Sequence, residues 1–249
     1  MPRRERDLVR LLTLTRKALR LLARPRFARA ALRHNVAAAI EHLQAIEHTS
    51  AETLIDIGAN KGQFSLAFRG LRPRADIIAF EPLDDDADRY ERLFGGDERV
   101  RLHRLAIGDA DTEAEFHVTD RSDSSSLLKP GSGQSAAFGV SHQETIRVPV
   151  RRLGPFVDWN ALPHPILIKI DVQGAELQAL RGCDGLESAD FVYVELSFVE
   201  LYEGQPLFDE VSAYLTERGF KLAGIFNQVV TAAFGPTQAD FLFAKAVAD

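Results

Sequence analysis

The stretch LIDIGANKGQFS, Leu54–Ser65, decides the fold. An apolar run reaches one carboxylate, Asp56, and then passes Gly58, Asn60 and Gly62 before the sequence turns amphipathic. This pattern predicts a buried strand, a tight turn and the first turn of a helix, whose amide groups are unpaired. Because glycine permits positive φ and close approach of the backbone, we expect this turn to contact a ligand.

The same alternation of strand and helix continues along the chain. We expect strands at residues 53–58, 76–82, 100–108, 166–171, 191–196, 221–226 and 240–245. Helices are expected at about 62–70, 84–94, 174–181 and 207–218. Strands that alternate with helices predict a parallel sheet covered on both faces. The last two strands have no helix between them and predict an antiparallel hairpin. The expected fold is therefore an α/β, doubly wound, mostly parallel, seven-stranded Rossmann-like sheet.

The alternation breaks between residues 109 and 165. AEFHV (114–118) and TIRVPV (145–150) predict a β-ribbon around a polar loop, Ser122 to Gly139. The glycine and serine content of the loop indicates a mobile lid over an acceptor, or else a plain polar connection.

Charge divides the 249 residues into two parts. Residues 1–34 carry eleven Lys and Arg against Glu5 and Asp7, a net charge of +9, although the whole chain carries −6. Residues 5–23 predict a helix with a leucine stripe, and Pro25 separates it from a second helix at about 27–48. We therefore divide the chain into a basic helical extension, 1–48, and a domain, 49–249.

The extension has two interpretations that the sequence leaves open. Its basic helices could lie peripherally on the inner, anionic face of a membrane, where each Lys or Arg contributes about 1 kcal/mol. They could equally cap the sheet or form a homodimer contact. Nucleic acid is disfavoured because the body is acidic and has no basic–aromatic platform. With no apolar run of membrane-spanning length and no secretory leader, the cytoplasm is the expected compartment.

A second strand-end carboxylate, Glu81, follows Gly62 by 19 residues. A carboxylate at this place can accept both hydroxyls of a ribose, through hydrogen bonds worth roughly 1.5–3 kcal/mol each. Two nucleoside ligands satisfy that condition, NAD and S-adenosylmethionine. A carboxylate at the turn, Asp56, would repel a pyrophosphate and attract an ammonium group, so we favour S-adenosylmethionine.

At this point the chain resembles the FkbM-type family of S-adenosylmethionine-dependent methyltransferases, a branch of the class I methyltransferase fold. The resemblance rests on DIGANKGQFS (56–65), AFEP (79–82), LAIGD (105–109), SSSL (124–127), VRRL (150–153), LIKIDVQGAELQAL (167–180), VELSFVELYEGQ (194–205) and LTERGF (215–220). It implies methyl transfer to a hydroxyl on a sugar, a glycan or a polyketide-like acceptor, and it does not name that acceptor.

The resemblance also implies roles for individual donor-binding residues. The methionine end of the donor would be held by Asp56, Gly58, Asn60 and Gly62. Glu81 would bind the ribose. Leu105 and Ala106, at the end of the third strand, would lie near the adenine.

The acceptor end requires a base, because methyl transfer to an oxygen removes a proton. Asp171 is the first candidate, with Glu176 one helical turn further on and Glu195 on the neighbouring strand. Glu176 also has a structural interpretation, as an acid at a helix N-terminus, and Lys169 could face the same site or pair with an acid. Tyr202 could line the acceptor pocket or pack the last helix.

Two further questions concern metals and alternatives. Asp171 and Glu195 could together orient Mg²⁺, which prefers oxygen ligands, whereas the seven histidines and single cysteine form no zinc pattern. Cys183 is expected to be a small thiol that is buried or half-buried. The alternatives to a methyltransferase are a non-catalytic nucleotide-binding module and an NAD-dependent enzyme on the same fold.

Overall fold

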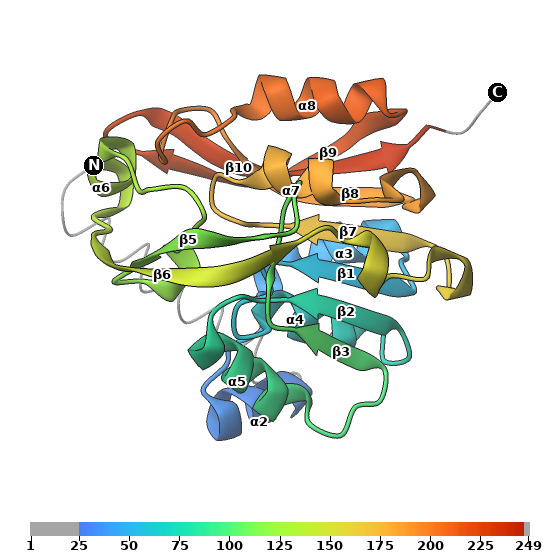
Figure 1. Ribbon diagram of the computed structural model, residues 1–249. Coiled ribbons are helices and arrows are strands. Elements are labelled where there is room, and N and C mark those ends of the chain that lie inside the picture. The colour runs from blue at the N-terminus through green and yellow to red at the C-terminus, as the bar shows by residue number, and fades with distance from the viewer. Residues whose placement is uncertain (1–24, 247–249) are drawn as a thin grey trace, which may run out of the picture.

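The computed structural model describes residues 25–246, and the helix expected at 5–23 lies outside this range. One sheet of seven strands runs through the described chain in the order β3-β2-β1-β7-β8-β10-β9 (Figure 1). Its strands are β1 (Thr53–Ile57), β2 (Asp76–Phe80), β3 (Val100–His103), β7 (Ile166–Ile170), β8 (Phe191–Ser197), β9 (Phe220–Thr231) and β10 (Gly235–Lys245). The first five are parallel, and β10 pairs antiparallel with both β8 and β9. The expected fold class and the terminal hairpin are confirmed.

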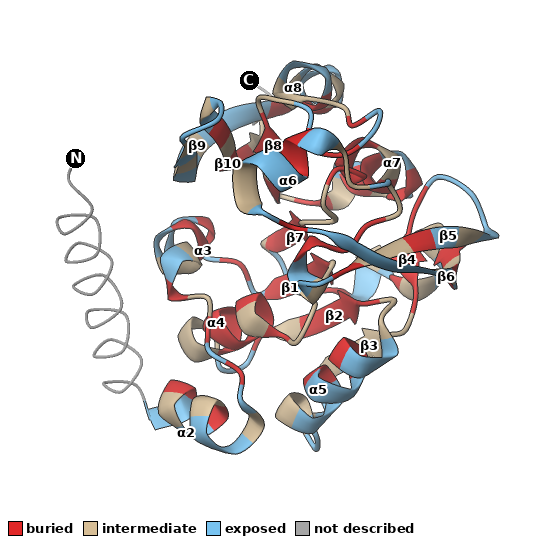
Figure 2. Ribbon diagram, turned by 90° about the vertical axis from the view of Figure 1, so that its left-hand side faces the viewer, coloured by how far each residue is buried: buried red, intermediate tan, exposed pale blue. Residues whose placement is uncertain are grey.

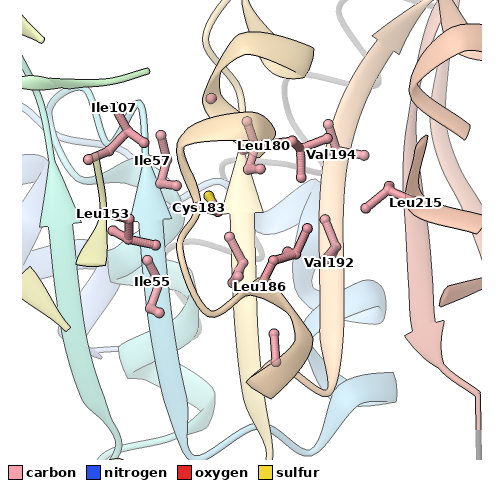
Figure 3. Close-up of a cluster of buried hydrophobic side chains, with 14 of the residues drawn as sticks. Ile55, Ile57, Ile107, Leu153, Leu180, Cys183, Leu186, Val192, Val194 and Leu215 are labelled. Carbon is pink, nitrogen blue, oxygen red and sulfur yellow. The ribbon is translucent and has the colours of Figure 1, made fainter. Parts of the chain in front are cut away.

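Helices cover both faces of this sheet. Those of the described chain are α2 (Pro25–His34), α3 (Leu43–Thr49), α4 (Gln63–Leu71), α5 (Asp84–Phe94), α6 (Ser132–Phe138), α7 (Glu176–Gly182) and α8 (Phe208–Glu217). Strand residues alternate between the faces: Leu54 packs with α2, α3 and α4, whereas Ile55 and Ile57 pack with α7 and α8. Figure 3 shows the second cluster, in which Cys183 is 5% exposed and burial raises the pKa of its thiol to about 12. The expectation of a buried thiol is confirmed.

The helix expected at 27–48 is wrong. Helix α2 ends at His34, and Asn35 takes a φ of 53°, which an α-helix cannot contain. Residues 35–39 are irregular, and a short 3₁₀ turn, η1 (Ile40–His42), leads into α3. Phe27, Ile40 and Ile46 nevertheless belong to the same buried cluster as Leu54 of β1. Figure 2 shows buried residues in α2 and α3 as well as in β1.

The strand expected at 100–108 is also wrong, because it divides into two. Strand β3 pairs with β2, but Ala106–Ile107 forms β4 in a separate sheet of order β4-β6-β5. Arg104 lies at the division and donates hydrogen bonds to Asp84, Asp88 and Glu91 of α5. Its anchoring to α5 turns the chain out of the large sheet. The other two strands are β5 (Thr112–Thr119) and β6 (His142–Arg151), which pair antiparallel and confirm the expected ribbon.

Candidate active site

A cavity of about 560 Å³ opens at the carboxyl ends of the parallel strands, within the size range of small-molecule sites. Its walls include the turn after β1, the ends of β2 and β7, the segments 35–42, 105–107 and 121–125, and side chains of β8 and β10. The expected site residues among its lining are Gly58, Asn60, Glu81, Leu105, Ala106, Asp171 and Glu195. Three expected residues lie elsewhere: Asp56, Gly62 and Glu176.

The two glycines of the first turn have a packing reason. Gly58 has a φ of 76°, and a Cβ there would overlap the carbonyl oxygen of Asp171. Gly62 has a φ of 87°, and its Cβ would contact Phe94 and Tyr90 of α5 at 2.9 and 3.0 Å. The turn after β1 therefore lies directly against the end of β7 and against α5. Only Gly58 reaches the cavity.

The expectation that Asp56 meets a ligand is not supported by its position. Its side chain is fully buried, accepts a hydrogen bond of 2.6 Å from Ser65, and lies 3.3 Å from the ammonium of Lys169. Lys169 lies between Asp56 and the cavity, which it lines, and donates to the Gly58 carbonyl at 2.8 Å. Burial alone would lower the pKa of Lys169, but Asp56 and Asp171 outweigh it and raise that pKa. The cavity therefore has a fixed cation here, and Asp56 is its buried counter-ion.

Glu81 and Asn60 both present oxygen acceptors at the cavity. The Glu81 carboxylate accepts the amides of Asn60 and Leu83 at 2.8 and 2.9 Å. Burial raises the pKa of Glu81 to about 7 against the effect of those two hydrogen bonds. Asn60 has a φ of 47° and donates its side-chain amide to Asp86, and its buried Oδ1 has no partner within residues 25–246. An orphaned acceptor beside a carboxylate with spare lone pairs fits a ligand that brings hydroxyl or ammonium donors.

Two carboxylates meet at the other end of the cavity. Gln173, with a φ of 55°, donates its side-chain amide to Asp171 at 2.7 Å and to Glu195 at 2.9 Å. Gln238 donates to the second oxygen of Glu195 at 2.6 Å. Burial, and then the charge of Asp171, raise the pKa of Glu195 well above its ordinary value. Glu195 therefore holds a proton more readily than a glutamate in water does, whereas the side chain of Asp171 is 38% exposed.

Comparison with known protein families shows the family of this chain. Residues 56–222 match the methyltransferase FkbM domain. The chain belongs to the FkbM methyltransferase family. It is an S-adenosylmethionine-dependent methyltransferase, as the resemblance in the sequence indicated. Family membership now carries the choice of donor, since the buried Asp56 no longer argues against a pyrophosphate.

Parts of this chain are similar in sequence to individual methyltransferases. It is 34% identical over 160 residues to the 2-O-methyltransferase NoeI of Sinorhizobium fredii, covering 61% of this chain and 66% of that protein. It is 24% identical to the hexuronic acid methyltransferase AglP of Haloferax volcanii, covering 58% and 56%. TehB of Haemophilus influenzae aligns over 88% of this chain and 67% of its own, at 8% identity and a TM-score of 0.48.

Glu176 has a supporting position in the FkbM domain. Its buried carboxylate accepts the amides of Val172 and Gly174 at 3.2 and 2.9 Å and does not line the cavity. Burial raises the pKa of Glu176 to about 7. These contacts hold the turn that carries Gln173, so they favour the structural interpretation over a direct role in chemistry.

Tyr202 and the loop 122–139 are joined to the same turn. The Tyr202 hydroxyl lies 3.0 Å from Gln173 Oε1, 2.8 Å from the Ser124 carbonyl and 2.9 Å from Gln134 Nε2. Tyr202 is 1% exposed and does not line the cavity, so its position does not support the first of its two expected roles, that of a pocket residue. A Cβ on Gly133 would overlap the carbonyl oxygen of Glu200, so this glycine serves close packing. Residues 121–125 line the cavity, and the lid function of the loop stays a prediction.

A magnesium site does not fit these residues. Within residues 25–246 no three His, Cys, Asp or Glu side chains come together as metal ligands. The Gln173 amide occupies the place between the two carboxylates, and the Lys169 ammonium lies 3.7 Å from Asp171. We derive no metal-dependent step.

No helix in the described part of the FkbM chain has the length and hydrophobicity to cross a membrane.

The segment 35–42 is a wall that the sequence did not predict. Asn35, Val36, Ala37, Ala38, Ala39, Glu41 and His42 line the cavity. They precede the part of the chain that matches the FkbM domain, 56–222, and they were assigned to an extension. Gln173, Gln238 and His42 were likewise missed as site residues, because amides and a lone histidine have no recognisable spacing.

Proposed function

We propose that this methyltransferase is an O-methyltransferase that acts on a hydroxyl of a sugar or glycan acceptor. The observation that carries the proposal is the Asp171–Gln173–Glu195 cluster at one end of a cavity whose other end holds Glu81 and Asn60. The names of NoeI and AglP, a 2-O-methyltransferase and a hexuronic acid methyltransferase, support the chemistry and the acceptor class.

The donor end would hold S-adenosylmethionine through groups of both charges. The spare lone pairs of Glu81 suit the ribose hydroxyls, and the fixed ammonium of Lys169 suits the donor's carboxylate. Asn60 Oδ1 suits the donor's ammonium group, and Gly58 brings the backbone close to it. Leu105 and Ala106 offer an apolar surface for the adenine. Asp56 and Gly62 act from behind, by fixing Lys169 and the turn.

Catalysis by this chain would consist of orientation and proton removal. When bound, S-adenosylmethionine supplies an activated methyl group on a positively charged sulfur. Asp171 would accept the proton of the acceptor hydroxyl, because its side chain is 38% exposed at the cavity, whereas burial favours the protonated form of Glu195. Gln173 would hold Asp171, and the protonated Glu195 would bind the acceptor. Base assistance of this kind contributes roughly 10²–10⁴-fold in rate.

A product screen tests the proposal. The protein is incubated with S-adenosylmethionine and a panel of monosaccharides that includes glucuronic acid, and products are examined by mass for one added methyl group. We expect a methyl ether that requires Asp171. A product methylated on nitrogen or carbon, or transfer that is limited to non-sugar acceptors, would contradict the assignment.

A further inference from the structure

A buried polar cluster lies behind the cavity wall, between β8 and β10. Asp240 is 6% exposed and accepts hydrogen bonds from Tyr193 at 3.0 Å and from the Asn227 amide at 2.7 Å. Asp240 is also the cross-strand neighbour of Glu195. The proposed mechanism gives this cluster no role. Burying a carboxylate costs free energy unless the carboxylate is paired and hydrogen-bonded.

The cluster holds one histidine of the cavity wall. His42, from η1, places Nδ1 2.9 Å from the Tyr193 hydroxyl and 3.3 Å from Asp240. Asn227 Nδ2 lies 3.2 Å from the same nitrogen. The imidazole also meets the edge of Phe64, with ring centroids 5.3 Å apart. Nδ1 is thus directed into the protein, and the ring itself lines the cavity with 21% of the side chain exposed.

The contacts of Nδ1 with the oxygens of Tyr193 and Asp240 favour one tautomer, although the Asn227 amide also lies beside this nitrogen. Burial and the charge of Asp240 raise the pKa of Tyr193 above its ordinary value, so its hydroxyl remains protonated and donates to Asp240. The tyrosine oxygen can then accept a proton-bearing Nδ1 of His42. A neutral imidazole protonated at Nδ1 has a bare Nε2 that accepts hydrogen bonds.

We propose that His42 is a substrate-binding residue whose Nε2 accepts a hydrogen bond from a second hydroxyl of the acceptor, next to the one that Asp171 deprotonates. The proposal rests on the proposed function, because it requires an acceptor that carries several hydroxyl groups. Tyr193 and Asp240 are positioning residues that fix the ring and its tautomer. Because His42 precedes the matched region 56–222, acceptor choice would be set partly by a segment outside the family's shared core.

The first test needs no turnover. Protein labelled with ¹⁵N-histidine is studied by NMR, and the His42 signals are assigned by comparison with His42→Phe. We expect the Nδ1-protonated tautomer, its loss in Tyr193→Phe, and a shift at Nε2 when glucuronic acid is added with S-adenosylhomocysteine. An Nε2-protonated tautomer, or no shift at Nε2, would overturn the proposal. A shift without methylated product would instead contradict the proposed function alone.

The second test separates acceptor binding from donor binding. His42→Phe should raise the KM for glucuronic acid about fivefold to a hundredfold, as loss of one hydrogen bond to a site group does, while calorimetric donor affinity stays unchanged. His48→Phe, an exposed histidine of α3, is the matched control. Tyr193→Phe should raise KM less, and should add nothing in the His42→Phe background. An unchanged KM in His42→Phe, or a loss of donor affinity, overturns the assignment.

Discussion

The side-chain amide of Gln173 donates a hydrogen bond of 2.7 Å to Asp171, and the same amide reaches Glu195. A donor shared by two carboxylates restrains both and offsets their mutual repulsion. Gln173→Leu keeps the approximate volume and removes the amide. We expect turnover to fall about tenfold or more, with donor affinity unchanged in calorimetry. Turnover equal to that of the wild type would show that the amide does not orient the base.

Glu81 should govern donor affinity more than folding. Glu81→Ala removes a carboxylate that lines the cavity and accepts two amides. Because hydrogen bonds to a charged acceptor are worth roughly 1.5–3 kcal/mol each, the dissociation constant of S-adenosylmethionine should rise at least about tenfold. Calorimetry measures it, and a thermal melt monitors folding. An unchanged dissociation constant in a folded variant would remove the ribose assignment.

The raised pKa of Glu176 should appear in the pH dependence of stability. Its pKa in the folded protein is about 7, above its ordinary value of 4.5, so the folded state holds the proton more tightly than the unfolded state. Its stabilising contribution is complete below pH 4.5 and is lost as pH rises through 7.

Glu176→Gln should therefore flatten the decline in the free energy of unfolding across this window, by on the order of 3 kcal/mol. Denaturant melts at several pH values measure this free energy. Glu217→Gln, which replaces an exposed acid of α8, is the control and should leave the curve unchanged. A parallel curve for Glu176→Gln would mean that the carboxyl titrates normally.

Alanine substitutions at Gly58 and Gly96 should distinguish the cost of backbone strain from the cost of steric overlap. Both have positive φ, 76° and 84°, but a Cβ at Gly58 overlaps the carbonyl of Asp171, whereas nothing lies within 4 Å of a Cβ at Gly96. Gly96→Ala should cost about 1–2 kcal/mol from its left-handed backbone alone. Gly58→Ala should cost clearly more and should also reduce transfer, because the end of β7 must move. Equal losses in thermal stability in the two variants would contradict the close packing of Gly58 against the carbonyl of Asp171.

The sequence predicted the centre of the sheet well because β1, β2, β7 and β8 are mostly buried. A short apolar run such as that of β7 is interpreted as a buried strand. Gly58 and Glu81 mark the ends of their strands independently of the residues that come after them. It failed where local patterns have two outcomes. A helical pattern over 27–48 does not reveal that Asn35 leaves the helix, and a strand-end carboxylate such as Asp56 looks the same whether it faces a ligand or a buried lysine.

Residues brought in from distant elements were not predictable. Gln238 reaches Glu195 through the pairing of β10 with β8, which is known only once the strand order is known. His42 joins the cavity because an irregular segment crosses the sheet's carboxyl edge. Neither depends on a local pattern in the sequence. The boundary expected at residue 48 stays a prediction, and Phe27 and Ile46 on its N-terminal side share a buried cluster with Leu54.

A separate hypothesis is that the basic segment 1–24 binds peripherally to anionic membranes. The cavity wall begins at Asn35, so a protein that lacks residues 1–24 should retain transfer to a soluble acceptor. Its net positive charge predicts that the same deletion weakens sedimentation with anionic vesicles at low salt. Equal sedimentation of the two proteins would exclude the peripheral membrane contact. Deletion of residues 1–42 should abolish folding, because it removes Phe27, Val36 and Ile40 from the core.

The most direct test of the account is the turnover of Asp171→Asn with the acceptor that the mass screen identifies, measured beside calorimetric affinity for S-adenosylmethionine. The substitution keeps the shape and removes the basicity of a cavity carboxylate that Gln173 orients and that lies 3.7 Å from the Lys169 ammonium. The account predicts a fall in turnover of about 10²-fold or more, with donor affinity changed less than about threefold. Turnover near that of the wild type, or loss of donor binding together with turnover, would contradict it.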